Sequence, residues 1–296
     1  MQRTRQIKKP NLVLCSDFHL RKDTLLCWTG DFQKEQWDSV DFVRNLQSKY
    51  DCPVIVAGDL FDKWYNSNDF LTTVMQHLPN QLYVIYGQHD LPNHSIDLAY
   101  KSSIDTLAEA GKVKILDECH YGQEPNKGSL FFPNREPDRT ILIWHKLAYQ
   151  KPPYPEATGG NAISILKKYH QFDLIVTGDN HLPFVEEYQG RLLVNPGCLT
   201  RQSVTEMNYK PRVYLWYADT NTVEPVYIPI QENVITREHI EIKEQRDARI
   251  DAFVSSFKDD YEIGLSFEQN LEEFFNKNQI RKEVKEVKEI IYKSIE

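Results

Sequence analysis

Residues 12–20 read LVLCSDFHL, an unbroken apolar run followed closely by an aspartate and a histidine. A short apolar run that ends in polar residues is typical of a buried strand. In extended backbone, Asp17 and His19 lie two positions apart and project from one face, so they can bind one ion together. This stretch therefore predicts a buried strand that presents a metal-binding pair at its carboxyl end.

Similar apolar runs recur along the chain, and each ends in glycine or a polar residue. They cover residues 54–57, 82–86, 140–144, 174–177, 192–194 and 213–217. Between them lie segments with helical spacing of apolar residues, at 34–50, 68–77, 95–109 and 162–169. Strands that alternate with helices predict an α/β domain, which we place at residues 1–230.

Chemically active residues follow most of these strands. Gly58-Asp59, Gly87-Gln88-His89-Asp90, Trp144-His145, Gly178-Asp179-Asn180-His181 and Asn195-Pro196-Gly197 each come directly after a predicted strand. Ligands of open α/β sheets bind beyond the carboxyl ends of the strands, so we expect these segments to converge. Each motif alone is more often a simple turn. Because four of the nine histidines fall in this ordered set, the set favours a metal site.

The expected ligands are carboxylates, amide oxygens and imidazoles, with no thiolate. Such a set suits manganese or a similar divalent ion, with magnesium, zinc and iron as alternatives. Two such ions roughly 3.5–4 Å apart would bind a phosphate and generate a hydroxide at neutral pH. The remaining histidines have no such context and are predicted to be structural or surface residues: His77, His94, His120, His170 and His239.

Composition limits the class of protein. The five cysteines are scattered and never spaced as C-x-x-C, which argues against a disulfide framework and fits a reducing cytoplasm, either bacterial or that of a virus's host cell. No apolar run approaches the roughly 20 residues of a membrane span, and the basic amino terminus lacks a secretory signal. The net charge of −8 argues against a simple nucleic-acid-binding protein, although a metal centre itself needs clustered carboxylates.

The order D-x-H, G-D, G-N-H-D, strand-end H and G-H-x-H resembles the calcineurin-like metallophosphoesterases, over residues 11–230. The segments GDLFD at 58–62, QHDLP at 88–92, HLPF at 181–184 and NPG at 195–197, followed by Arg201, resemble the SbcD branch of that superfamily. SbcD-type proteins are manganese-dependent DNA repair nucleases that work with an SbcC-type ATPase. The resemblance implies a two-sheet sandwich flanked by helices (α/β/β/α), with a small, mainly helical carboxy-terminal appendage.

The resemblance also implies a role for each site residue. The first metal would be bound by Asp17, His19, Asp59 and His181, and the second by Asp59, Gln88, His145 and Asp179. His89 matches the catalytic histidine, which would protonate the leaving oxygen or stabilise the transition state. Gln88 stands where the family has asparagine, and Asp179 where it has the first histidine of G-H-x-H. Both can still bind a metal, and the added carboxylate favours manganese or magnesium over zinc.

The composition shifts after residue 230, where charge density rises. Apart from a strand signal at 238–242, helical patterns dominate from residue 247. Residues 280–295 predict an amphipathic helix with an apolar stripe of Ile280, Val284, Val287, Ile291 and Ile295. That helix could pack on its own domain or dock on a partner. By resemblance, residues 231–296 would form a shortened capping and ATPase-binding segment.

We therefore predict a nuclease that hydrolyses DNA phosphodiesters, with exonuclease and endonuclease action both open. Its partners would be DNA and an SbcC-like ATPase of the SMC family, and it could pair with a second copy of itself. One alternative is a phosphoesterase for nucleotides, phosphoproteins or other small substrates, which the acidic net charge favours. An alternative of another class is a metal-poor interaction subunit, suggested by Gln88 and Asp179.

Overall fold

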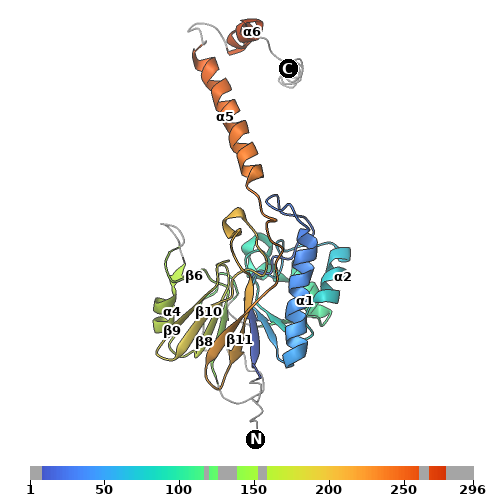
Figure 1. The fold of residues 1–296 in the computed structure, drawn as a ribbon, viewed down its shortest axis with the longest axis vertical. Helices are drawn as coiled ribbons and strands as arrows, with labels where there is room; N and C mark the ends of the chain where they lie inside the picture. Colours follow the sequence, from blue (N-terminus) through green and yellow to red (C-terminus); the bar gives the residue numbers. More distant parts are fainter. Residues whose placement is uncertain (1–8, 117–119, 126–138, 153–158, 260–266, 278–296) are drawn as a thin grey trace. The chain divides into compact units, whose positions relative to one another are not determined.

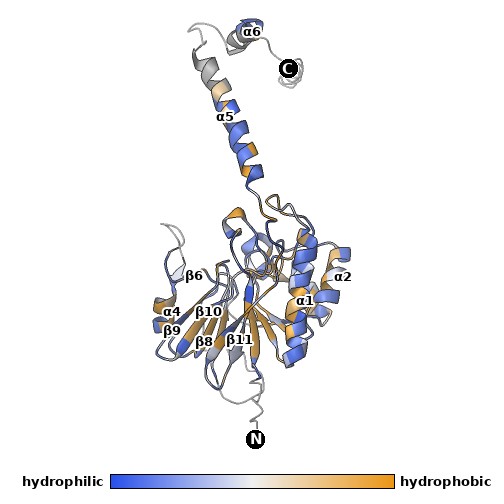
Figure 2. Ribbon diagram, in the orientation of Figure 1, coloured by the Kyte–Doolittle hydropathy of each residue, from blue (hydrophilic) through white to orange (hydrophobic). Residues whose placement is uncertain are grey.

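The computed structural model describes residues 9–116, 120–125, 139–152, 159–259 and 267–277. The chain divides into two compact units, residues 1–236 and 237–296. The first unit contains two main β-sheets with helices beside them (Figure 1). Figure 2 shows that the strands of this unit are largely hydrophobic, as buried strands should be.

The larger sheet has six strands in the order β12-β11-β1-β2-β3-β4. Strands β1 to β4 are parallel to one another, whereas β11 pairs antiparallel with β1, and β12 pairs antiparallel with β11. The strands span Leu12–Cys15 (β1), Val54–Val56 (β2), Leu82–Val84 (β3), Lys114–Ile115 (β4), Arg212–Tyr217 (β11) and Thr222–Tyr227 (β12). The carboxyl ends of β1, β2 and β3 therefore lie at one edge of this sheet.

The smaller sheet has four strands in the order β5-β8-β10-β9. Strands β5, β8 and β10 are parallel, and β9 pairs antiparallel with β10. Its strands span Ile141–Trp144 (β5), Leu174–Thr177 (β8), Phe184–Tyr188 (β9) and Arg191–Asn195 (β10). A separate parallel pair joins Ala148–Tyr149 (β6) to Gly160–Asn161 (β7).

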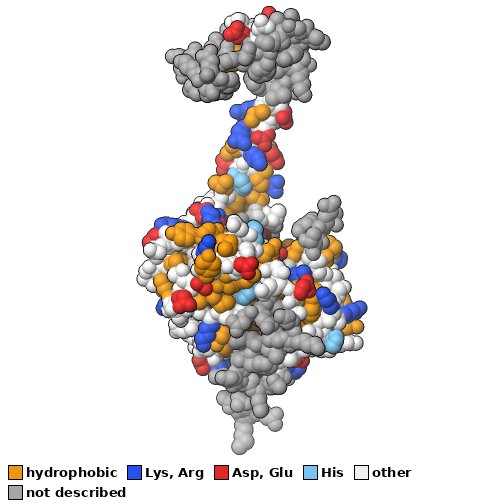
Figure 3. Space-filling view, turned by 180° about the vertical axis from the view of Figure 1, so that it is seen from behind, with side chains coloured by type: hydrophobic (Ala, Val, Ile, Leu, Met, Phe, Trp, Pro, Cys, Tyr) orange, Lys and Arg blue, Asp and Glu red, His pale blue; other side chains and the backbone are white. Residues whose placement is uncertain are grey.

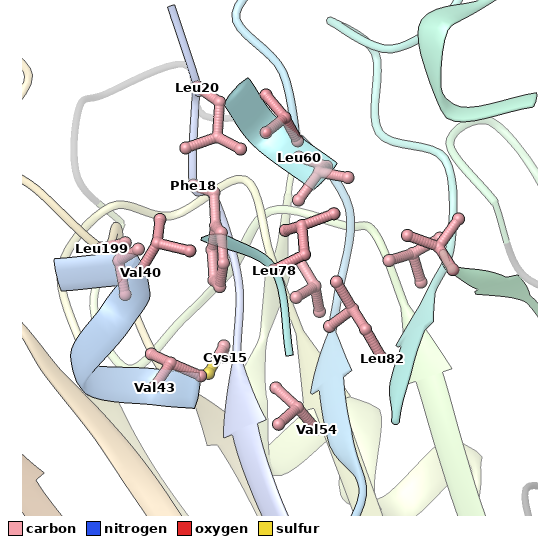
Figure 4. Close-up of a cluster of buried hydrophobic side chains, with 14 of the residues drawn as sticks. Cys15, Phe18, Leu20, Val40, Val43, Val54, Leu60, Leu78, Leu82 and Leu199 are labelled. Carbon is pink, nitrogen blue, oxygen red and sulfur yellow. The ribbon is translucent and has the colours of Figure 1, made fainter. Parts of the chain in front are cut away.

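The two sheets face each other across a buried apolar layer. Leu12 and Leu14 of β1 pack into this layer with residues of the smaller sheet, whereas Val13 and Cys15 pack on the other side of β1, against helices. Figure 4 shows Cys15 among the side chains of that outer layer. Successive side chains of a strand point to opposite faces, so a fully apolar strand is what a sheet covered on both sides requires.

Helices cover the outer faces. Helices α1 (Phe32–Tyr50), α2 (Asn68–His77) and α3 (Ser103–Glu109) pack on the larger sheet, and α4 (Ala162–Lys168) packs on the smaller one. Helix α1 begins at its N-cap Asp31, whose side chain accepts a hydrogen bond from the Lys34 N–H. The predicted α/β/β/α sandwich is confirmed.

Two predicted elements were wrong in detail. Residues 95–109 do not form one helix, because Ser102 adopts extended backbone and caps α3, which leaves a separate 3-10 helix at Ile96–Lys101. The strand signal at 238–242 is the start of helix α5 (Glu238–Asp259). Two alternating isoleucines suggested a strand, but the residues that follow are mostly Glu, Lys, Gln, Arg and Ala, which favour helix.

The second unit contains α5 and α6 (Phe267–Lys277) among its described residues. Figure 2 shows α5 as largely hydrophilic where its colour is given. Among the described helices of the whole chain, none is both long and apolar enough to span a membrane. The predicted amphipathic helix at 280–295 lies outside the described residues.

Candidate metal centre

The segments that follow the strands converge, as the topology requires. Residues after β1, β2 and β3 of the larger sheet meet residues after β5 and β8 of the smaller sheet. The structure links all eight predicted site residues through direct contacts: Asp17, His19, Asp59, Gln88, His89, His145, Asp179 and His181. The expected convergence of these groups is therefore present in the fold.

One group of ligand atoms belongs to Asp17, His19 and His181, and these atoms lie within 4.8 Å of one another. The Nε2 atoms of His19 and His181 are 3.2 Å apart. Asp59 Oδ2 lies 3.8 Å from His19 Nε2, which brings the carboxylate of the second strand to the same place. This set contains the four residues that the resemblance assigned to the first metal.

A second group consists of Asp17, Asp59 and His145, again within 4.8 Å of one another. His145 Nε2 lies 3.5 Å from Asp59 Oδ2 and 2.8 Å from Gln88 Oε1. The Gln88 amide in turn donates to Asp179 Oδ1 at 2.7 Å. Asp59 thus stands between the two groups, where a bridging ligand would be needed.

The tautomer of His145 is set by a backbone contact. Its Nδ1 lies 2.7 Å from the Ala57 carbonyl oxygen, which can only accept, so Nδ1 carries a proton. The Nε2 atom of the neutral ring then directs a lone pair into the ligand cluster. Burial disfavours a second proton, but the carboxylates of Asp59, Asp17 and Asp179 outweigh it and raise the pKa of His145 to about 10. The cluster therefore attracts a cation at this nitrogen.

His181 is oriented in the same way by a carboxylate. Its Nδ1 lies 3.1 Å from Glu206 Oε1, and Glu206 is itself buried. Burial opposes protonation, yet Glu206 and Asp17 raise the pKa of His181 to about 9. Burial lowers the pKa of His19 to about 3, so the charged His181 ring donates to the neutral His19 ring.

Two buried carboxylate oxygens in the cluster are suited to bind a cation. Asp17 Oδ2 and Asp59 Oδ2 have no hydrogen-bond partner among the described residues. Buried polar atoms nearly always have a hydrogen-bond partner. Two anionic oxygens without one, beside three imidazoles, therefore form a ligand set suited to divalent ions. Burial raises the pKa of Asp17 to about 6. Burial acts the same way on Asp59, but His145 and His19 hold the pKa of Asp59 below its usual range.

The backbone at the ligands is strained. Asp17, His19, Asp59 and Asp179 all have positive φ, at 49°, 45°, 51° and 73°. Such conformations cost roughly 1–3 kcal/mol each in non-glycine residues and concentrate at functional sites. The loops hold each other in place, since Asp17 and His19 donate backbone hydrogen bonds to the Gly58 and Asp59 carbonyls at 3.1 and 3.0 Å.

Two glycines of the motifs allow this close approach. A Cβ atom on Gly87 would lie 2.1 Å from Asp59 Oδ1, and one on Gly58 would lie 2.2 Å from His145 Nδ1. Gly58 also has a φ of +90°, which other residues rarely adopt. The Gly-Asp and Gly-Gln-His-Asp motifs therefore need glycine because of packing against the ligands.

His89 sits at the edge of the cluster with its own supports. Its backbone N–H donates to Asp59 Oδ1 at 2.9 Å, and its Nδ1 lies 2.9 Å from the Asp62 carbonyl oxygen. Nδ1 is therefore the donor to Asp62, which leaves Nε2 for a substrate. The ring is perpendicular to His19, with centroids 4.8 Å apart.

Sequence reasoning missed three supporting residues, two of which act through their carboxylates. Asp90 accepts hydrogen bonds from the backbone N–H groups of Leu60, Phe61 and Gly87, and so joins the loops after β2 and β3. Asp62 positions His89, as described above, through its carbonyl oxygen. Glu206 orients His181 but lies 25 residues further along the chain. Asp90 and Asp62 belong to the quoted motifs, whereas nothing in the sequence pointed to Glu206.

The structure places the other highlighted residues outside the cluster. His120 is buried, and its Nδ1 accepts the Tyr86 N–H at 3.2 Å. His77 stacks on Trp37. Arg201 forms a buried ion pair with Glu35 at 3.2 Å, so its role is to join chain segments. His94 is exposed but borders the site, with Nδ1 3.0 Å from the Gln88 carbonyl oxygen.

Comparison with known proteins gives the family. The calcineurin-like phosphoesterase model matches residues 10–183, and the chain belongs to this family. The activity of this family is the hydrolysis of phosphoesters with divalent metal ions. No curated protein sequence matches the chain.

Solved structures resemble the chain at low identity. A novel archaeal phosphodiesterase is 15% identical, with a TM-score of 0.41, over 73% of this chain and 98% of its own. The phosphopantetheinyl hydrolase PptH of Mycobacterium tuberculosis is 14% identical, with a TM-score of 0.43, over 74% and 96%. A putative 5'-nucleotidase of Staphylococcus aureus is 12% identical, with a TM-score of 0.43, over 80% and 58%.

Proposed function

We propose that this chain is a manganese-dependent DNA nuclease of the SbcD type. The first metal is assigned to Asp17, His19, Asp59 and His181, and the second to Asp59, Gln88, His145 and Asp179. Bound divalent ions supply a Lewis acid and a nucleophilic hydroxide at neutral pH. The segments GDLFD, QHDLP, HLPF and NPG, which go beyond the general family motifs, motivate the assignment to DNA.

The observation that carries this proposal is that two cavities border one ligand cluster. A cavity of about 440 Å³ is lined by Gln88 and His89. Another, of about 260 Å³, is lined by His145 and Asp179. Gln88, which lines the first cavity, donates a hydrogen bond to Asp179, which lines the second. A phosphate within a strand needs room for the chain on both of its sides, whereas a terminal phosphate needs only one pocket.

The charge near the site is compatible with a polyanion despite the net charge of −8. Lys63 lines the larger cavity and Lys146 the smaller one. Two divalent ions would neutralise the clustered carboxylates between them. Figure 3 shows the mixed character of one face, where basic and acidic side chains alternate and hydrophobic side chains gather in one area. The substrate would therefore be held at the metal centre and not by a broad basic surface.

Within this assignment His89 is the general acid. Its Nδ1 is fixed on the Asp62 carbonyl, which leaves Nε2 free, and His89 lines the cavity that adjoins the ligands. A proton on that nitrogen can be given to the leaving oxygen as the phosphodiester bond breaks. His145 and His181 cannot take this role, since their Nε2 atoms belong to the ligand cluster.

The decisive experiment incubates the purified chain with labelled single- and double-stranded DNA in manganese, magnesium or chelator. We expect cleavage with manganese and none with chelator. A nucleoside phosphodiester and a phosphopeptide serve as comparison substrates. Hydrolysis of those without DNA cleavage would replace the nuclease by a small-substrate phosphoesterase. Absence of all hydrolysis, with fewer than two bound metals, would favour an interaction subunit.

We also propose that residues 280–295 recruit an SbcC-like ATPase, since their apolar stripe suits a groove on a partner. A chain that ends before Ile280 should keep hydrolysis of a small phosphodiester, because no assigned ligand lies beyond it. It should lose co-purification with the ATPase. Normal ATPase binding by the shortened chain, or its failure to fold, would assign the stripe to the unit's own core.

A further inference from the structure

Two adjacent aromatic side chains are exposed beside the metal centre. Trp64 is 38% exposed and Tyr65 is 68% exposed, and their ring centroids lie 5.6 Å apart. Both line the cavity of about 440 Å³ that also contains Gln88 and His89. The other four tryptophans, Trp28, Trp37, Trp144 and Trp216, are buried or packed against the core. Trp64 is therefore the only one of the five tryptophans whose ring is markedly exposed.

The segment that carries these rings is held in place at several points. The Trp64 carbonyl accepts the Ser103 N–H at 2.7 Å, at the start of α3. The Asn66 side chain donates to the Lys63 carbonyl at 2.9 Å and to Ser103 Oγ at 3.2 Å. Asp62, two residues before Trp64, accepts from His89. The aromatic pair and the proposed general acid thus belong to one hydrogen-bonded framework.

A further ring lines the same cavity. His94 lines it, and the His94 ring lies 6.1 Å from Tyr121, which lines the smaller cavity. Asn93 and His94 both have positive φ, at 52° and 56°. The contact of His94 Nδ1 with the Gln88 carbonyl holds this strained pair against the ligand loop. Flat rings therefore line both cavities that border the metal centre.

We infer that Trp64 and Tyr65 form a stacking subsite for an unpaired nucleobase next to the phosphate at the metal centre. This inference rests on the proposed nuclease function and names the form of DNA that the site accepts. Every base has a flat π-face, so stacking on aromatic rings tolerates any sequence. Lys63, in the same cavity, supplies a cation for a neighbouring phosphate.

The subsite selects for unpaired strands because of a simple competition. A base inside a duplex is already stacked on its neighbours, and removing it costs a few kcal/mol. A base in a single strand or a frayed end does not bear that cost in full. The chain should therefore bind and cut single-stranded or frayed DNA in preference to internal duplex DNA.

Tryptophan fluorescence tests binding without turnover. In manganese, with His89→Ala as a background that keeps its metals but turns over slowly, a short oligothymidylate should quench the emission of the full chain. Trp64→Phe should abolish the quenching but keep most of the affinity, measured by anisotropy of labelled DNA, because phenylalanine still stacks. The double variant Trp64→Ala/Tyr65→Ala should lose affinity by roughly 5- to 100-fold. Tyr100→Ala, which removes a 65% exposed ring that lines neither cavity, is the matched control and should bind normally.

A kinetic test locates the subsite on the substrate. One abasic position is moved along a single-stranded oligonucleotide, and kcat/KM is measured in manganese. We expect one position where the missing base slows the wild type by roughly 5- to 100-fold, while the same change has little further effect on the double variant. This coupling is not expected from a merely structural role of the two rings.

The outcomes separate this inference from the nuclease proposal. If the wild type cleaves DNA but the double variant binds and cleaves normally, the stacking subsite is wrong and the nuclease stands. If DNA is not cleaved yet quenches Trp64 fluorescence, the nuclease proposal is wrong and the nucleobase site stands. Equal quenching by deoxynucleoside monophosphates at the same molar concentration would show that the site binds mononucleotides and not a DNA strand. If the double variant has lost its metals, the Trp64→Phe variant alone decides the question. Quenching that persists in Trp64→Phe would then show that the stacking subsite is wrong.

Discussion

Asp59 and His89 are joined by a hydrogen bond of 2.9 Å from the His89 backbone N–H to Asp59 Oδ1. The other oxygen, Asp59 Oδ2, faces the imidazoles of His19 and His145 at 3.8 and 3.5 Å and has no hydrogen-bond partner among the described residues. One carboxylate thus positions the proposed general acid and offers a bridging oxygen to two ions. Substitution of this residue should disturb metal binding and catalysis together.

Asp59→Ala should lose both metals and essentially all hydrolysis, because the only proposed bridging oxygen is removed. Metal content by mass spectrometry and the rate on a small phosphodiester give the result. Chelation of the wild type should have the same effect, reversed by manganese. Asp38→Ala, which changes an exposed side chain of α1, is the control and should behave as wild type. Two tightly bound ions in Asp59→Ala would show that Asp59 is not a metal ligand and serves only in the turn.

His89→Ala should keep its metals and lose turnover by roughly a hundred- to ten-thousand-fold, since a general acid acts in the transition state and is not a ligand. The measurement is kcat with metal content determined in parallel. His170→Ala, an exposed histidine, provides the control. Parallel loss of metal and activity would move His89 into the ligand set.

Glu206→Gln should weaken metal binding roughly 10- to 100-fold, because it removes the negative charge that polarises the His181 ring. Titration with manganese, followed by calorimetry, measures the change. The same variant should regain most activity at high manganese, which separates a positioning role from a catalytic one. An unchanged affinity would show that His181 needs no such support.

Metal binding should release protons near neutral pH. In the metal-free protein the pKa values of His145 and His181 are raised to about 10 and about 9, so both rings are charged at pH 7. A ligand must be neutral at the coordinating nitrogen, so up to two protons leave when ions bind, and affinity rises with pH until those pKa values are passed. Calorimetry in buffers of different ionisation enthalpy counts the protons. Binding without proton release below pH 8 would contradict this account.

Arg201→Ala should destabilise the fold by about 3–5 kcal/mol, because it leaves the buried Glu35 carboxylate without its ion pair. Urea unfolding of the metal-free protein measures the loss. Lys34→Ala removes an exposed ion pair on the same helix and should show no measurable change. A stable Arg201→Ala variant with weakened DNA binding would assign this arginine to the substrate instead.

Much of the sandwich could be predicted from local patterns. Strands such as β1 and β8 are apolar on both faces, which only a sheet covered on both sides explains. Weakly patterned elements were missed. Strand β12 is an exposed edge strand that contains Pro225, and β4 has only two residues. The helix predicted at 95–109 is interrupted at Ser102, whose side chain caps the start of α3. The spacing of apolar residues does not reveal such a cap.

The sequence by itself determined the candidate ligands and their order, since each stands directly after an apolar strand and parallel strands end at a common edge. Only the tertiary structure decided how they combine. It places Gln88 in contact with both His145 and Asp179. It also fixes the proton of His145 on Nδ1, which donates to the Ala57 carbonyl, and places Glu206 in contact with Nδ1 of His181. Those contacts join residues far apart in the chain through strained loops. Their geometry depends on the packing of two sheets, which no local spacing encodes.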